Sequence, residues 1–223
     1  MSRSHLKILL ATVLASILLT GCSSASDYFG DGMIEVEIFD SVATMARASD
    51  LVVAATVSDV VVSDYTEEWG IEIQHFAEIV LDVSRTFGQR KSFGAPVDDR
   101  VSFLTYLGAE DIDHTLEHLR EALPGGETRW FLRSVETDDR EFYILVNSAG
   151  AVTPSQDGSY MTAAFYQRSS ELAHAGRLEE VESHRALLAE ITKMRPADVD
   201  SNLKDAAQGP RDLGHVVPPE SRP

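Results

Sequence analysis

Two histidines and a glutamate stand close together in the segment His114-Thr115-Leu116-Glu117-His118. On a helix, His114 and His118 lie one turn apart on the same face, so their imidazoles can reach one metal ion. Glu117 could then activate a metal-bound water for hydrolysis. This spacing makes His114 and His118 candidate metal ligands. It also makes a metal-dependent hydrolase the alternative to a protein without catalytic activity.

The spacing resembles the H-x-x-E-H motif of the inverted zinc peptidases. The resemblance implies a third, acidic ligand far downstream on another helix, in the neighbourhood of Glu190. The chain departs from that family because it is much shorter and has a different expected order of strands. A surface helix that happens to carry two histidines explains the motif without chemistry. We therefore expect no enzymatic activity, no cofactor and no resident metal.

The rest of the sequence offers few other patterns that carry chemistry. It contains no Gly-x-Ser-x-Gly, no phosphate-binding loop, no dinucleotide fingerprint and no Cys-x-x-Cys. The acidic pairs in the expected loops lack the alternating oxygen ligands of a calcium loop, so we interpret them as solvated charges. Three aromatic residues on expected strands, Tyr106, Trp130 and Tyr143, could line a concave barrel face and form a candidate ligand face. Packing in the core is the alternative for all three.

The charge of the chain disfavours one class of partner. Lysine and arginine number 19 against 36 aspartate and glutamate residues, which gives a formal net charge of −17 at pH 7. Affinity for nucleic acid depends on clustered basic side chains that contact phosphates. We therefore expect no nucleic acid partner.

The amino-terminal segment has the pattern of an export signal. Basic residues up to Lys7 precede an uncharged apolar run from Ile8 to Leu19, which is too short to span a bilayer comfortably. The following Leu19-Thr20-Gly21-Cys22 resembles the bacterial lipobox. The resemblance implies cleavage between Gly21 and Cys22, lipid on the thiol of Cys22 and often a further acyl chain, such as palmitate, on the new amino terminus. The membrane is then a partner through Cys22, on the extracytoplasmic face of the cell membrane.

Cys22 is also the only cysteine of the chain. This excludes an intramolecular disulfide and any zinc site built from cysteines.

After the amino-terminal segment, the spacing of apolar residues is mostly that of strands. It predicts strands over 51–63, 71–87, 101–107, 128–135, 142–147 and 151–153, and helices over 40–49, 111–123 and 178–194. The strands over 128–135 and 142–147 are expected to pair as antiparallel neighbours. Residues 196–223, with five prolines and scattered charges, are interpreted as a disordered tail.

Two segments carry a resemblance at the level of the fold. Ala46-Arg47-Ala48-Ser49-Asp50-Leu51-Val52-Val53 joins a helix end to a valine-rich strand, and Gly126-Glu127-Thr128-Arg129-Trp130-Phe131-Leu132 precedes and forms a later strand. Both resemble the OB-like barrel of netrin-like and tissue-inhibitor-of-metalloproteinase modules, and a group of secreted bacterial proteins. The resemblance implies a mainly β protein with helices (α+β), namely a small Greek-key barrel of about five or six strands. A short helix leads it, a second helix is inserted, and an amphipathic helix follows.

The expected organisation follows from these segments. It comprises a signal peptide (1–21), a lipidated tether (22–36), an OB-like barrel (37–166), a helical segment (167–195) and the tail (196–223). Inhibition of a metalloprotease is not implied, because Cys22 is separated from the barrel and is expected to carry lipid. We expect a non-enzymatic extracytoplasmic lipoprotein whose barrel binds an envelope protein, a peptide or a glycan.

Overall fold

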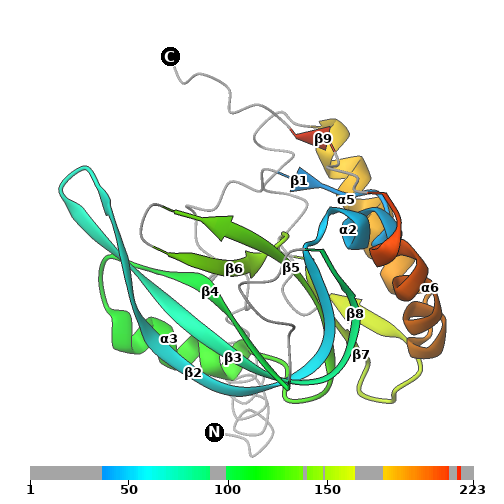
Figure 1. Cartoon of the computed structure of the whole chain (residues 1–223), viewed down its shortest axis with the longest axis horizontal. Helices are drawn as coiled ribbons and strands as arrows, with labels where there is room; N and C mark the ends of the chain where they lie inside the picture. The colour runs from blue at the N-terminus through cyan, green and yellow to red at the C-terminus, as the bar shows by residue number, and fades with distance from the viewer. Residues whose placement is uncertain are drawn as a thin grey trace, which may run out of the picture.

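Figure 1 shows a computed structural model of the chain. It describes residues 37–90, 99–137, 140–147, 149–163, 178–210 and 215–216. The predicted signal peptide, the predicted cleavage site between Gly21 and Cys22, and the predicted tether lie outside these residues. Within the described part of the chain, no helix combines the length and the apolar character needed to cross a membrane.

The described residues form a mainly β structure with four helices. In chain order the elements are β1 (Glu37–Ile38), α2 (Val42–Ala48), β2 (Leu51–Trp69), β3 (Glu72–Gln89), β4 (Arg100–Gly108), α3 (Ile112–Ala122), β5 (Thr128–Glu136), β6 (Glu141–Leu145), β7 (Ala151–Pro154), β8 (Met161–Ala163), α5 (Leu178–Ile191), α6 (Pro196–Gln208) and β9 (His215–Val216). All nine elements predicted from the sequence are present, so the prediction of a mainly β protein with helices is confirmed. The strands β1, β8 and β9 and the helix α6 were not predicted.

The main sheet has seven antiparallel strands in the order β4-β3-β2-β5-β7-β8, with β6 pairing with β5. The strands β2 and β3 form one long hairpin, closed by a two-residue turn between the paired Trp69 and Glu72. Gly70 in this turn has φ +69°, a conformation that costs glycine little. Several register shifts bend the hairpin, and β6 comes to lie beside β4. No hydrogen-bonded ladder joins β4 to β6 among the described residues. The backbone hydrogen bonds between the strands therefore leave the sheet open and do not close it into a barrel.

The two faces of β2 enter two different cores, which explains its continuous apolar sequence. Leu51, Val53 and Ala55 point into an inner core that the sheet encloses together with α3. The side chains between them, Val52 and Ala54, belong to an outer core beneath the helices. The inner core also contains Ala77, Ile79, Leu81, Phe103, Leu116, Leu119, Trp130, Leu132, Tyr143 and Leu145.

The outer core lies under α2, α5 and α6, which gather on one side of the sheet (Figure 1). The prediction of a disordered tail is wrong for 196–208, because these residues form α6. Pro196 begins the helix, where its missing N–H costs nothing, and Val199, Leu203 and Ala207 form a buried stripe at helical spacing.

The contact between α6 and β3 is very close at Gly88. A Cβ atom placed on Gly88 would lie 2.5 Å from the Cβ of Ala207. The two backbones can approach in this way only because Gly88 has no side chain.

A buried ionic cluster also ties α6 to the sheet. Asp200 accepts hydrogen bonds from Nε of Arg129 at 2.9 Å and from its second guanidinium nitrogen at 3.0 Å. Arg85 donates to the same carboxylate at 2.9 Å. Because the Arg129 side chain is only 6 % exposed, Asp200 neutralises a charge that water scarcely reaches.

Candidate functional site

The two histidines lie where the sequence predicted them, on one face of α3. Leu116 and Leu119 anchor the opposite face of the helix in the inner core. The Nε2 atoms of His114 and His118 are 3.1 Å apart, and their ring centroids are separated by 4.1 Å. Glu121 places Oε2 3.7 Å from Nδ1 of His118. The pair could hold a metal ion through two nitrogens.

The third ligand that a zinc hydrolase needs does not join them. Glu190 instead accepts a hydrogen bond of 2.8 Å from the backbone N–H of Val42, at the contact between α2 and α5. The helices α3 and α5 lie on opposite sides of the molecule (Figure 1). Among the described residues, no group of three or more histidine, cysteine, aspartate or glutamate side chains could hold a metal. The convergence of His114, His118 and Glu190 that the alternative hydrolase would require is therefore not found among the described residues.

The candidate ligand face of Tyr106, Trp130 and Tyr143 is not a single surface. Trp130 is fully buried, packs against Phe103 at 5.3 Å between ring centroids, and donates its Nε1–H to the carbonyl of Ala55 at 3.2 Å. Tyr143 is 4 % exposed and belongs to the same core. Both side chains support the sheet from inside, because the strand positions they occupy face inward.

Burial also changes the acidity of Tyr143. Loss of water around the phenol, with the nearby negative charges of Asp50 and Glu141, raises the pKa of Tyr143 to about 12. Its hydroxyl therefore stays protonated at neutral pH and cannot serve as a general base.

Tyr106 belongs instead to a row of half-buried rings. The centroids of Phe76 and Tyr106 are 5.8 Å apart, those of Tyr65 and Phe76 are 5.2 Å apart, and those of Tyr65 and Phe142 are 5.0 Å apart. These four residues, Tyr65, Phe76, Tyr106 and Phe142, are called the aromatic row below. The guanidinium of Arg140 lies 5.7 Å from the ring of Tyr65. The row joins the outer half of the hairpin, at Tyr65 and Phe76, to β4 and β6 and stiffens that junction.

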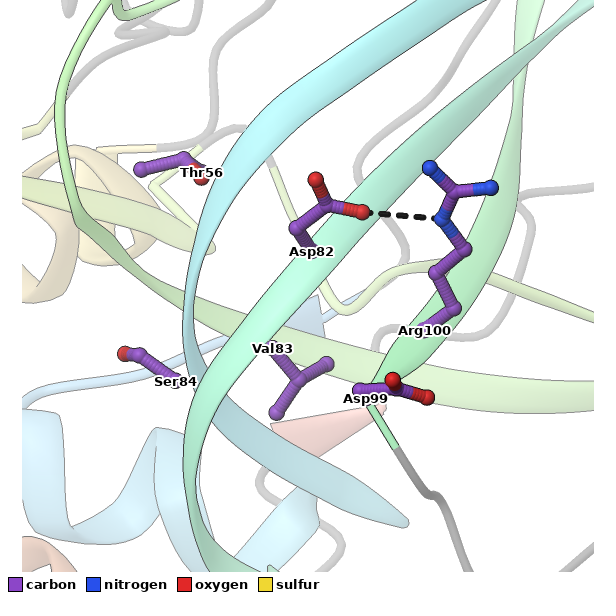
Figure 2. Close-up of a pocket in the computed structure, with 6 residues that line it drawn as sticks. All are labelled: Thr56, Asp82, Val83, Ser84, Asp99 and Arg100. Atoms are coloured by element: carbon purple, nitrogen blue, oxygen red, sulfur yellow. Dashed lines mark hydrogen bonds and ion pairs between the residues drawn. The ribbon is translucent and has the colours of Figure 1, made fainter.

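A hollow in the described surface lies at the other end of the hairpin and is shown in Figure 2. Its volume is about 580 Å³, and it is lined by Thr56, Asp82, Val83, Ser84, Asp99 and Arg100. Arg100 donates to Asp82 at 2.9 Å, and Thr56 and Ser84 lie away from this pair (Figure 2). The hydrogen bond from Arg100 lowers the pKa of Asp82. This carboxylate is thus held in its charged form by an arginine.

The outer half of the β2–β3 hairpin has the most unusual surface of the described chain. Large exposed apolar side chains are Val61, Val62, Ile71, Ile73 and Tyr160. Four of these five lie on the hairpin, and Ile71 at its tip is completely exposed. The sequence predicted two strands here but not this surface. The signal was present in the run Val60-Val61-Val62 and in the alternation Ile71-Glu72-Ile73.

The open edge of β2 is occupied by side chains. The strand pairs with β5 only over Leu51–Ala55, so its later residues have no ladder on that side. Arg120 of α3 donates to the carbonyl of Val60 at 2.6 Å, and the carboxylate of Asp59 accepts from the N–H of Val60 at 2.8 Å. Ser63 accepts from the N–H of Tyr65 at 3.1 Å. These contacts block the addition of another strand at this part of the edge.

Comparison of the chain with protein-family models, with curated proteins and with solved structures finds no match.

Proposed function

We propose that this protein is a membrane-anchored extracytoplasmic lipoprotein that binds a protein partner through the outer half of its β2–β3 hairpin, without catalysis. The observation that carries the proposal is the concentration of exposed apolar side chains on this hairpin: Val61, Val62, Ile71 and Ile73. Burying one such side chain contributes about 1.5–3 kcal/mol. A hairpin that keeps several of them in water presents a typical interaction surface.

The charges around the apolar tip favour a partner with basic groups. Glu68 and Glu72 are exposed beside Ile71, and Glu67 is half-buried and accepts a hydrogen bond from the hydroxyl of Tyr65 at 2.5 Å. Like charges repel across an interface. The acidic tip therefore disfavours anionic lipid and a second copy of the same tip. It fits an apolar depression of a protein that is rimmed by lysine or arginine.

The protected edge of β2 determines the mode of contact. Because Arg120, Asp59 and Ser63 occupy backbone groups along that edge, a partner has little opportunity to add a strand there. We expect it to contact the side chains of the hairpin instead. The aromatic row holds the outer half of the hairpin at Tyr65 and Phe76, so the tip is presented with a small loss of conformational entropy on binding.

We also propose that the sheet is an OB-like barrel. Three observations support this: the meander β2-β3-β4, the helix α3 between β4 and β5, and the position of β6 beside β4. An inserted helix within a run of antiparallel strands is what the resemblance to netrin-like modules leads us to expect. In such a barrel, β6 approaches β4 and encloses the inner core, which includes Trp130 and Tyr143.

The lipid on Cys22 would place this hairpin near a membrane surface. Residues 22–36 can extend over at most about 50 Å, which limits the distance of the domain from the bilayer. Replacing Cys22 by serine should release the domain into the medium or leave an uncleaved precursor. Unchanged mass and unchanged membrane retention would contradict lipidation.

Site-specific photocrosslinking in intact cells tests the docking surface. A photoreactive residue at position 71 should give a discrete crosslinked species, and Ile73→Ser should reduce its yield strongly without lowering the amount of folded protein. The matched control is Tyr160→Ser, which removes an exposed apolar side chain away from the hairpin. Equal yields from Ile73→Ser, Tyr160→Ser and the unchanged protein would refute docking through the hairpin. Raised salt should weaken the contact, because basic and acidic groups are expected to meet at its rim.

A further inference from the structure

We propose that His114 and His118 form a two-histidine binding site for a divalent transition-metal ion on the exposed face of α3. This site is independent of the hairpin and of the lipid anchor. His114 is exposed and the side chain of His118 is 25 % exposed, so an ion can reach both from solvent. The helix is fixed beneath them, because Leu116 and Leu119 are buried in the inner core.

The separation of the two nitrogens suits a shared ion. Two imidazole nitrogens bound at 2.0–2.1 Å lie about 3.3 Å apart around a tetrahedral ion and about 3.0 Å apart around an octahedral one. The Nε2 atoms of His114 and His118 are 3.1 Å apart, between these two values. In the metal-free protein one Nε2–H donates to the other ring. Binding of an ion replaces that hydrogen bond with two metal–nitrogen bonds and requires little movement of either side chain.

Glu121 is placed to orient one of the ligands. Its Oε2 lies 3.7 Å from Nδ1 of His118, on the side of the ring away from His114. This distance is longer than a hydrogen bond, but the Glu121 side chain is 71 % exposed and needs only a small rotation to accept from Nδ1–H. Such a bond fixes the tautomer in which the lone pair of Nε2 is available to a metal. Exposed carboxylates nearby, at Asp113 and Glu117, add a negative potential that attracts a cation.

The ligand chemistry selects the class of ion. Imidazole nitrogen favours zinc, nickel and copper, whereas calcium and magnesium prefer oxygen ligands. No third histidine, cysteine or carboxylate joins the pair among the described residues. An ion held here therefore keeps open coordination positions, which water or a group from another molecule can fill. The site resembles neither a closed structural zinc centre nor the three-ligand hydrolase considered for this motif.

Titration of the full chain with zinc chloride and nickel chloride, followed by calorimetry and by NMR of the histidine rings, tests the proposal. We expect resonances of His114 and His118 to shift together. His114→Gln and His118→Gln should each weaken binding by roughly tenfold or more, since each leaves a single nitrogen ligand. Glu121→Gln should weaken it by a smaller factor, which separates a positioning residue from a ligand. Calcium chloride should not compete.

A matched control uses another histidine of the described chain. His75→Gln changes a half-buried residue on β3 and should leave zinc affinity unchanged. Unchanged zinc and nickel affinity in the double variant His114→Gln/His118→Gln would overturn the proposal. So would an absence of ring shifts at millimolar zinc in the unchanged chain. Circular dichroism of each variant confirms that the helix is retained, because neither imidazole packs in the core.

Discussion

The contact between Asp200 and Arg129 predicts a large loss of stability from one substitution on α6. Arg129 has a side chain only 6 % exposed, and it donates twice to Asp200 and once to Glu127 at 3.1 Å. In Asp200→Ala, the guanidinium stays buried but keeps only Glu127, whose side chain is 45 % exposed. Removing one partner of a buried ion pair costs about 3–5 kcal/mol.

Two features place the expected value below that range. Glu127 still offsets part of the charge, and the side chain of Asp200 is itself 19 % exposed. We expect the free energy of unfolding to fall by about 2–3 kcal/mol, which for a domain of this size lowers Tm by roughly 4–12 °C. Urea denaturation followed by circular dichroism measures the change.

Arg85→Ala is the matched control, because it removes the other partner of the same carboxylate. Arg85 is 61 % exposed, and an exposed pair of this kind contributes about 0–1 kcal/mol. If Asp200→Ala destabilises the protein no more than Arg85→Ala does, the ion pair with Arg129 does not hold α6 and the reasoning is refuted. Amide hydrogen exchange adds a local test: exchange should accelerate in α6 far more than in β4.

Three further predictions concern acidity and packing. Hydrogen bonds from two neighbouring serines lower the pKa of Asp157 to about 2. The contribution of this carboxylate to the free energy of unfolding is therefore complete above about pH 4 and is lost as the pH falls towards 2. NMR titration of the carboxyl group measures the pKa. Burial raises the pKa of Tyr143 to about 12. The folded state should therefore lose stability as the pH rises from about 10 to 12. An absorbance titration that gives the phenol of Tyr143 an ordinary pKa would contradict its burial. Gly88→Val should displace α6 and lower Tm, because even a Cβ atom at this position would lie 2.5 Å from the Cβ of Ala207. Gly125→Val is the control and should change Tm little, because a Cβ atom there would have nothing within 4 Å. Equal changes in Tm would show that the close approach of α6 to β3 is unimportant.

Local patterns predicted most of the elements because each carries its own signal. The valine-rich run of β2 and the stripe of Leu116 and Leu119 in α3 depend only on neighbouring residues and on which face is buried. Helix α6 had such a signal too. Pro196 stands at a favourable first position, and Val199 and Leu203 recur at helical spacing. The prolines that follow the helix favour a disordered tail, whereas the stripe of Val199 and Leu203 favours a helix.

The arrangement of the candidate sites could not be predicted in the same way. Strand periodicity does not reveal which face of β5 is enclosed, so Trp130 was equally compatible with a ligand face and with the core. The pairing of Arg129 with Asp200 joins residues 71 positions apart, and nothing local marks it. The place of Glu190 in the fold cannot be read from the sequence for a similar reason. Its distance along the sequence suited a third ligand, whereas the packing of α5 on α2 places it at Val42.

The outer core has a consequence for the order in which the chain folds. Its amino-terminal contributor, α2, packs against α5 and α6, and the hydrogen bond between Val42 and Glu190 joins residues 148 positions apart. During synthesis, the apolar side chains of α2 and the outer face of β2 therefore remain uncovered until almost the entire chain has emerged. Such long-range closure slows folding and prolongs the interval in which a chain can aggregate or be kept extended by a chaperone. Among the described helices, the first to be made is thus one of the last to be buried.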